Sequence, residues 1–135
     1  MEETGNRAID IIIAQKLGFY VKHGTLYTPS GTLMGGDVRA NMGMYELEDN
    51  TEIWQNYTPR FTKNVDDAIW ITKQIQPVYF QLLYSPDRMN WRAEFAFDYR
   101  NDIFVDAKEP AEAISLAFLE WHASTHPIET STHTR

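Results

Sequence analysis

The sequence predicts an α+β fold: a single domain in which an antiparallel β-meander of three to five strands packs with two to three helices, as in an α–β–α sandwich. Residues 91–98, WRAEFAFD, alternate apolar and polar side chains, which is the period of a strand with one buried face. Segments with helical periodicity flank this region at 64–76 and 110–122. The intervening turns are short, and short turns favour antiparallel neighbours.

The first element is predicted to be a helix from Arg7 to Leu17, where isoleucines recur near helical spacing and Gly18 is suited to the C-cap. A short strand at 19–21 follows. From His23 to Arg60, glycines punctuate short apolar pieces, a pattern that indicates hairpin turns with short strands or a long docked loop. A structureless loop of this length is uncommon in a compact domain, so we expect short strands or docking.

A second helix is predicted at 64–76. Thr62 or Asn64 can cap it, and Asp66 and Asp67 lie in its first turn, where the helix dipole favours negative charge. Its expected packing face consists of Val65, Ala68, Ile69 and Thr72.

Strands are then predicted at 78–85, 91–98 and 103–107, joined by the turns PDRMN and YRND. The closing helix, 110–122, begins with a proline and glutamates, where the dipole is positive. Its apolar stripe consists of Ile114, Ala117, Phe118 and Trp121. We expect this helix to cover the sheet, with a core that includes Ile114, Phe118, Phe95 and Phe97.

Length and composition are those of one small domain with its own core: 135 residues, of which 43% are apolar. We place the domain at 1–122, with an insertion at about 23–56 and a polar C-terminal tail at 123–135. The absence of cysteine excludes disulfides, thiolate zinc sites and a cysteine nucleophile. There is neither a secretory signal pattern nor an apolar run long enough for a membrane span, so no membrane contact is expected.

The formal net charge of −7 argues against nucleic acid as a partner, because an acidic domain repels phosphates unless it carries a local basic patch. No such patch is visible in the sequence. The order helix, three strands, helix is shared with double-stranded RNA-binding domains, whose closing helix begins with lysines. Here that position is KEPAEA, so we predict no RNA binding.

Four segments of the chain resemble the phage ABA sandwich domain family: IIIAQKLGFYV, YTPRFTKNVDDAIWI, WRAEFAF and VDAKEPAEAISLAFLEW. They are similar to the family's opening helix, its capped Asp/Ala-rich helix, its central strand and its closing helix. The resemblance covers roughly residues 8–21 and 57–121 and leaves His23 to Asn56 as an insertion, with Trp70 one place later than in the family pattern. It implies an α–β–α fold and a phage origin. With the absence of cysteine, which is typical of a reducing compartment, we expect the host cytoplasm as the location. The family has no general activity assigned to it.

No catalytic motif is recognisable: there is no Ser-His-Asp context, no His-Glu-x-x-His pattern and no dinucleotide-binding fingerprint. We therefore predict a protein that is not an enzyme and uses no cofactor, and a small nucleotide hydrolase is the competing hypothesis. His122 and His126 have the i, i+4 spacing of a metal-binding pair, but the helix ends there and HASTH contains no glutamate. We favour a frayed helix end over a metal site.

The candidate contact surface lies mainly in the insertion, which combines glycines, methionines, carboxylates and Trp54 without an extended period. GTLMGGD, from Gly31 to Asp37, is either a hairpin turn, which we favour, or a nest of N–H groups for a phosphate. YELEDNTE is either a solvated loop, the more common case, or a decoy surface for a basic partner. The candidate binding residues are Gly35, Gly36, Arg39, Tyr45, Glu48, Asp49, Trp54, Arg88 and Arg92. If the insertion is not the site, the open face of the meander around Arg92 and Glu94 is the next candidate.

Two functions follow from these features and from the resemblance. In the first, the acidic and aromatic surface binds and blocks a host protein, in a host-takeover or counter-defence role. In the second, arginines, stacked aromatic rings and the glycine loop hold a nucleotide-derived immune signal, so that the protein acts as a sponge. The net charge of −7 favours a basic protein partner over an anionic ligand. The insertion is also suited to a homodimer arm, because methionine and aromatic residues are common in interface cores.

Overall fold

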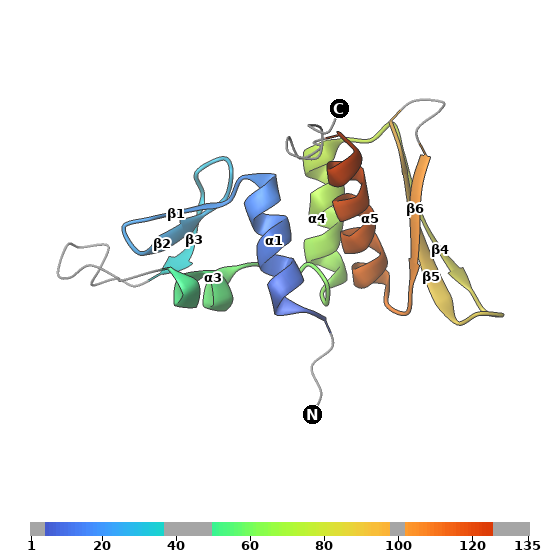
Figure 1. Ribbon diagram of the computed structural model, residues 1–135, viewed down its shortest axis with the longest axis horizontal. Coiled ribbons are helices and arrows are strands. Elements are labelled where there is room, and N and C mark those ends of the chain that lie inside the picture. Colours follow the sequence, from blue (N-terminus) through green and yellow to red (C-terminus); the bar gives the residue numbers. More distant parts are fainter. Residues whose placement is uncertain (1–4, 37–49, 98–101, 126–135) are drawn as a thin grey trace, which may run out of the picture. The chain divides into compact units, whose positions relative to one another are not determined.

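The computed structural model describes residues 5–36, 50–97 and 102–125 (Figure 1). Within these ranges, four helices and two three-stranded antiparallel sheets confirm the α+β class. The described residues form two compact units, one within Asn6–Arg60 and one from Phe61 onward that also takes in Gly5. The predicted insertion at 23–56 lies in the first unit, together with the first helix.

The first unit holds two helices and three short strands: α1 (Arg7–Leu17), β1 (Tyr20–Lys22), β2 (Thr25–Tyr27), β3 (Leu33–Gly36) and α3 (Thr51–Tyr57). Helix α1 has its predicted bounds. The Asn6 side chain accepts a hydrogen bond from the Ile9 N–H at 3.1 Å, and Gly18 closes the helix with a φ of 103°. The expected short strands are present as β1 to β3, whereas α3 was not predicted.

Arg7 joins α1 to the segment that contains α3. The Asp10 side chain is 1% exposed and lies 3.0 Å from the Arg7 guanidinium. Arg7 also donates hydrogen bonds to the carbonyl oxygens of Gln55, at 2.6 Å, and Pro59, at 3.3 Å. A buried carboxylate is stable only when it is paired and hydrogen-bonded, so Asp10 fixes the Arg7 guanidinium, and the two donations from Arg7 hold α1 to the segment of α3.

The second unit holds the predicted helix, meander and closing helix: α4 (Val65–Ile75), β4 (Tyr79–Ser85), β5 (Asn90–Ala96), β6 (Asp102–Ala107) and α5 (Pro110–Thr125). All five lie close to their predicted bounds. The strand order is β4-β5-β6, and the register places Arg92 opposite Leu83 on one side and Asp106 on the other. Because side chains alternate along a strand, this register fixes which residues share each face of the sheet.

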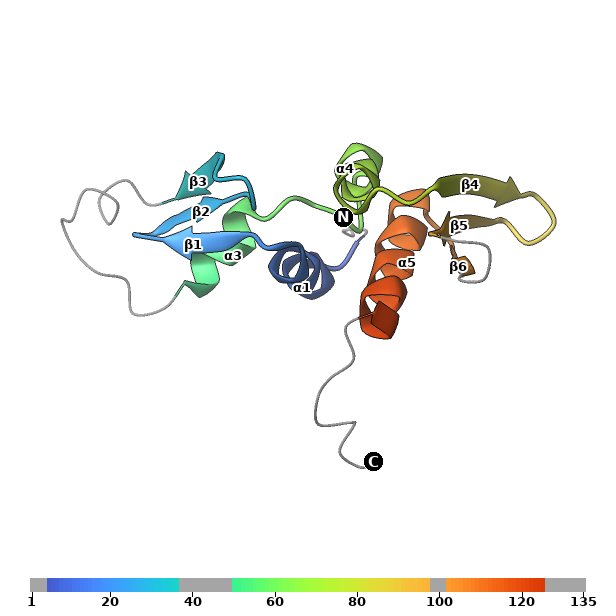
Figure 2. The ribbon, with the colours of Figure 1, turned by 90° about the horizontal axis from the view of Figure 1, so that it is seen from above.

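Both helices of the second unit lie on the same side of the sheet, with α5 directly on β5 and β6 and α4 packed mainly on α5 (Figures 1 and 2). The predicted core residues Phe95, Ile114 and Phe118 are fully buried. Phe97 is half-buried instead, with its ring stacked on Trp121 at 5.1 Å. Since α5 has neighbours on two sides, its buried surface is wider than the predicted stripe and consists of Ala111, Ala113, Ile114, Ser115, Ala117 and Phe118.

Helix α4 departs from its predicted packing face at Val65, which is exposed, and at Ile71, which is buried although it was not part of that face. Asn64 caps it by accepting from the Asp66 N–H at 2.9 Å, whereas Thr62, the other candidate cap, is buried. The buried residues are Ala68 and Ile71, and Val65 is 37% exposed. The prediction for Val65 was wrong because α4 turns the 68 and 71 side toward its neighbours, which rotates the first turn out to solvent.

Candidate functional site

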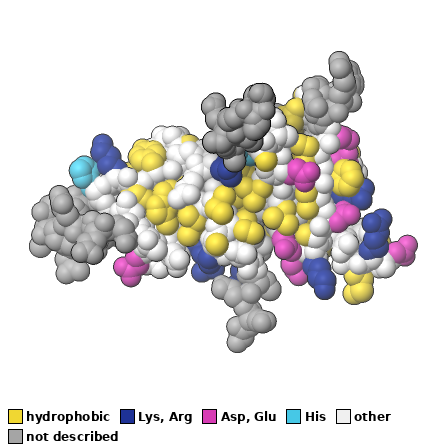
Figure 3. Space-filling model, viewed as in Figure 1, with side chains coloured by type: hydrophobic (Ala, Val, Ile, Leu, Met, Phe, Trp, Pro, Cys, Tyr) yellow, Lys and Arg dark blue, Asp and Glu magenta, His cyan; other side chains and the backbone are white. Residues whose placement is uncertain are grey.

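The sheet of the second unit has one face against α5 and another that no described helix covers (Figure 1). On the covered face, Ala93 and Phe95 are fully buried. The register assigns alternate residues of the three strands to the uncovered face, and eight of them are Tyr79, Gln81, Leu83, Arg92, Glu94, Asp102, Phe104 and Asp106. We call these eight residues the open face. In the space-filling view, charged side chains of both signs gather over this sheet beside apolar ones (Figure 3).

Arg92 is held at the centre of the open face by two contacts with β6. Its Nε donates to Asp106 Oδ1 at 2.8 Å and its Nη2 donates to Asp106 Oδ2 at 3.1 Å, a bidentate pair. Its guanidinium carbon also lies 4.2 Å from the centre of the Phe104 ring, within the range of a cation–π contact. The guanidinium is thus fixed in position although it faces solvent.

The contact with Arg92 changes the pKa of Asp106. The hydrogen bonds from Arg92, and then the charge of that guanidinium, lower the pKa of Asp106 below the ordinary range of an aspartate. The same hydrogen bonds raise the pKa of Arg92. Both groups therefore remain charged, and the pair persists into acid below the pH at which a free aspartate would take up a proton.

A second carboxylate contact lies nearer the other end of the open face. Glu94 pairs directly with Phe104, and Asp102 pairs with Ala96, so the two acids are diagonal neighbours across β5 and β6. A hydrogen bond with Asp102 raises the pKa of Glu94, with burial and the charge of Asp102 as smaller causes. Two carboxylates this close favour a shared proton or an added positive charge between them.

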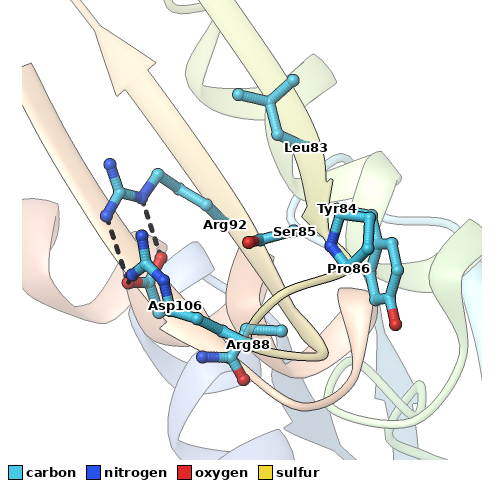
Figure 4. Close-up of a pocket in the computed structure, with 8 residues that line it drawn as sticks. Leu83, Tyr84, Ser85, Pro86, Arg88, Arg92 and Asp106 are labelled. Carbon is cyan, nitrogen blue, oxygen red and sulfur yellow. Dashed lines mark hydrogen bonds and ion pairs between the residues drawn. The ribbon is translucent and has the colours of Figure 1, made fainter.

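The open face is hollowed where the β4–β5 turn meets β6 (Figure 4). This hollow, the turn pocket, has a volume of about 350 Å³ and is lined in part by Leu83, Ser85, Pro86, Arg88, Asn90 and Asp106. Arg88 reaches in from the turn and lies 3.8 Å from Asp106 Oδ2. The turn is closed by a hydrogen bond from the Met89 N–H to the Ser85 carbonyl at 2.8 Å, with Met89 in the left-handed region at a φ of 55°.

The predicted site residues do not form one cluster. Arg88 and Arg92 meet at Asp106, whereas Gly35, Gly36 and Trp54 belong to the first unit. The other candidates, Arg39, Tyr45, Glu48 and Asp49, lie outside the described residues. Sequence reasoning missed Asp106 and Phe104. The alternation in IFVDA indicates that these two residues share a face, and the strand register then places Asp106 opposite Arg92 and Phe104 opposite Glu94.

The favoured hairpin turn is present at the start of GTLMGGD, where the Gly31 N–H donates to the Thr28 carbonyl at 2.9 Å between β2 and β3. The two glycines that we selected for binding lie elsewhere. Gly35 and Gly36 are the last residues of strand β3. A Cβ on Gly35 would lie 2.4 Å from the Tyr57 ring, and one on Gly36 would lie 2.3 Å from the Gly24 carbonyl oxygen. These glycines are needed for close packing between β3 and its neighbours, a role that requires no phosphate.

The described residues include no group of three or more His, Cys, Asp and Glu side chains placed to hold a metal ion. His122 packs beside the Phe118 ring at 5.8 Å, and His126 lies outside the described residues. Among the helices that the structure describes, none combines the length and the apolar character needed to cross a membrane.

No family model, curated protein or solved structure matches this chain. The resemblance to the phage ABA sandwich domain family therefore stays a prediction from the sequence.

Proposed function

We propose that this protein acts by binding, and that the open face of the second unit takes up a basic segment of another protein. The feature that carries the proposal is the arrangement of apolar side chains around a fixed ion pair on a sheet face that no described helix covers. Under the phage resemblance, the partner is a host protein and the outcome is host takeover or counter-defence.

The apolar part of the open face is composed like the centre of a protein interface. Tyr79, Leu83 and Phe104 are 43%, 46% and 50% exposed, although each is large enough to gain from burial. Tyrosine, phenylalanine and arginine are enriched in interface cores, and the residues that contribute most binding energy cluster around such side chains. A partner that covers these three side chains would contact their apolar surface and Arg92 at the same time.

Arg92 supports the proposal because it is already ordered. Association usually loses free energy when a flexible side chain is immobilised, about 0.5–1.5 kcal/mol for a long one. The bidentate pair with Asp106 and the Phe104 ring fix the guanidinium before any partner arrives. A partner that contacts Arg92 therefore meets a preformed surface.

The charge of the open face indicates that the partner's contact surface is positively charged. Three carboxylates, Glu94, Asp102 and Asp106, stand against one guanidinium, that of Arg92. Asp106 is neutralised by Arg92, so the Glu94 and Asp102 pair carries the excess negative charge. A lysine or arginine of the partner would relieve the repulsion between these two acids, in keeping with the net charge of −7.

The test is capture from host lysate with two matched variants. The face variant, Leu83→Ser with Phe104→Ser, removes apolar contact area from the open face. The control variant, Leu33→Ser with Met34→Ser, removes exposed apolar side chains from β3 of the first unit. We expect a basic protein that the parent and the control variant retain, that the face variant loses, and whose binding weakens as salt is added.

Other patterns of retention would contradict the proposal. Loss by the control variant with retention by the face variant would place the contact in the first unit, as the sequence predicted for the insertion. A captured protein that all three forms retain equally does not use the open face. Circular dichroism of each variant must show the parent secondary structure for these comparisons to count.

The absence of enzymatic activity remains a prediction. The protein should leave a panel of nucleotides intact in the presence of Mg²⁺, Mn²⁺ or Zn²⁺. Turnover that survives repurification would favour the competing hypothesis of a small nucleotide hydrolase.

A further inference from the structure

The turn pocket has the size of a small-molecule site. Its volume of about 350 Å³ is at the lower end of the range of roughly 300–1,000 Å³ that such sites occupy. Leu83 and Pro86 provide apolar wall, and charged or polar side chains line the rest. The dimensions suit a compact molecule with an apolar body and one polar group.

The charged side chains that line the turn pocket, Arg88, Arg92 and Asp106, leave one positive charge in surplus. Arg92 and Asp106 neutralise each other through their bidentate contact. Arg88 adds a second guanidinium, and its only ion pair within the described chain is the 3.8 Å approach to Asp106. That separation exceeds a hydrogen bond, and the Arg88 side chain is 61% exposed, so its N–H groups are available to a ligand.

Two further donors border the same space. Ser85 and Asn90 face each other in the register where β4 and β5 enter the turn. The described residues provide no hydrogen-bond partner for the Ser85 hydroxyl or the Asn90 side-chain amide. In Figure 4 the Ser85 hydroxyl is directed across the pocket toward the Arg92 side chain. A guanidinium, a hydroxyl and an amide thus surround a hollow next to an apolar wall.

We propose that the turn pocket binds a small monocarboxylate, with the carboxylate on Arg88, Ser85 and Asn90 and the apolar body against Leu83 and Pro86. A guanidinium fork matches the two oxygens of a carboxylate. The single surplus charge selects a monoanion, because the fixed Asp106 carboxylate repels a second negative charge. Binding is reversible and forms no covalent bond. The argument for this ligand does not rest on the proposed protein partner, although the turn pocket shares Leu83, Arg92 and Asp106 with the open face.

The experiment uses the full chain, labelled with ¹⁵N, and benzoate as the probe. A ligand of this size is expected to bind with a Kd on the order of 1–10 mM. Saturable shifts should appear in the amides from Leu83 to Arg92 and in the Arg88 Nε–H signal. Benzamide, which has the same ring without the charge, should give no saturable shift, and phenyl phosphate should bind more weakly than benzoate.

Substitutions of Arg88 identify the group that holds the carboxylate. Arg88→Gln should raise the Kd for benzoate at least about tenfold, because a charge-assisted hydrogen bond is lost. Arg88→Lys should give a smaller increase, since it keeps the charge but not the fork. Lys73→Gln, which removes one positive charge from α4, should change the Kd less than about twofold.

Three results would overturn the inference. The first is the absence of saturable benzoate shifts at concentrations several times the expected Kd. The second is an unchanged Kd in Arg88→Gln, which would place the anion elsewhere. The third is tighter binding of phenyl phosphate than of benzoate, which contradicts the charge balance of the turn pocket.

Discussion

The two sheets of this protein have the same number of strands and the same antiparallel pairing, but different features fix them. The strands β1, β2 and β3 are three or four residues long, and two glycines allow β3 to approach its neighbours. The strands β4, β5 and β6 are six or seven residues long, and their side chains alternate between α5 and the open face. The packing of the first sheet depends on close approach of its backbone, whereas the packing of the second depends on the alternation of its side chains.

This difference explains why the open face is free to serve another purpose. In the second sheet, the covered face provides the stabilising burial through Ala93 and Phe95, so the other face can carry ion pairs and exposed rings. The first sheet has no division into a buried face and an exposed face. Its strands are too short for a clear alternation of buried and exposed side chains, and the neighbouring residues Thr25 and Leu26 are both buried. We expect substitutions to affect the two sheets by different mechanisms.

The largest effect is expected from Phe118→Ala, which removes a buried ring of α5 from the core of the second unit. Phe118 is 1% exposed, and removing a buried phenylalanine ring destabilises by about 3–5 kcal/mol. Urea unfolding followed by hydrogen exchange should show lost protection for the amides of β5 and β6. Retention of parent stability would mean that α5 does not anchor the covered face.

A smaller but substantial effect is expected from Gly36→Ala in the first sheet. The added Cβ would lie 2.3 Å from the Gly24 carbonyl oxygen and 2.5 Å from the Thr25 Cα, so the backbone must move. The expected loss is about 1–3 kcal/mol, the usual cost of overpacking.

The matched control for Gly36→Ala is Leu33→Ala, which alters an exposed side chain of the same strand. It should change the free energy of unfolding by less than about 0.5 kcal/mol. Equal effects of the two substitutions would contradict the role that close approach has in the first sheet.

The smallest effect is expected from Glu94→Gln on the open face, and it depends on pH. The folded pKa of Glu94 is raised, so ionised Glu94 weakens the folded state above that pKa and has no such effect below its ordinary value. Glu94→Gln should therefore stabilise at neutral pH, by a few tenths of a kcal/mol because solvent screens the half-buried site, and the gain should vanish as the solution becomes acidic.

The cause of the Glu94 effect is tested by adding Asp102→Asn. If the repulsion between the two acids is responsible, Glu94→Gln should have little further effect in the Asp102→Asn background. Thermal unfolding across the acid range measures this. A gain that persists in acid, or in the double variant, would remove Asp102 as the cause.

The elements that the sequence predicted well are those with local signals. Helix α1 has a side-chain cap at Asn6 and a glycine end at Gly18, and β5 has a full alternation, so their positions follow from neighbours in the chain. Helix α3 has neither signal. It is seven residues long, its N-cap Asn50 makes no side-chain hydrogen bond, and its Tyr57 is placed by the close approach of Gly35.

The candidate site was predicted only in part, for a physical reason. Arg92 was identified as a polar residue of an alternating strand, but its partner Asp106 is fourteen positions further along and is defined by strand register. Register depends on turn geometry and on packing against α5, which a single strand pattern does not reveal. Gly35 and Gly36 were assigned to ligand binding because a glycine needed for packing and one needed for a phosphate have the same sequence signal.

The most direct test of the account is to map the amide shifts of the ¹⁵N-labelled protein when the captured basic partner is added. Contact through the open face predicts that the largest shifts lie in β4, β5 and β6, at alternate residues that include Leu83, Arg92 and Phe104, with little change in β1 to β3. Shifts confined to β1, β2 and β3, or to α3, would contradict the account and place the contact in the first unit.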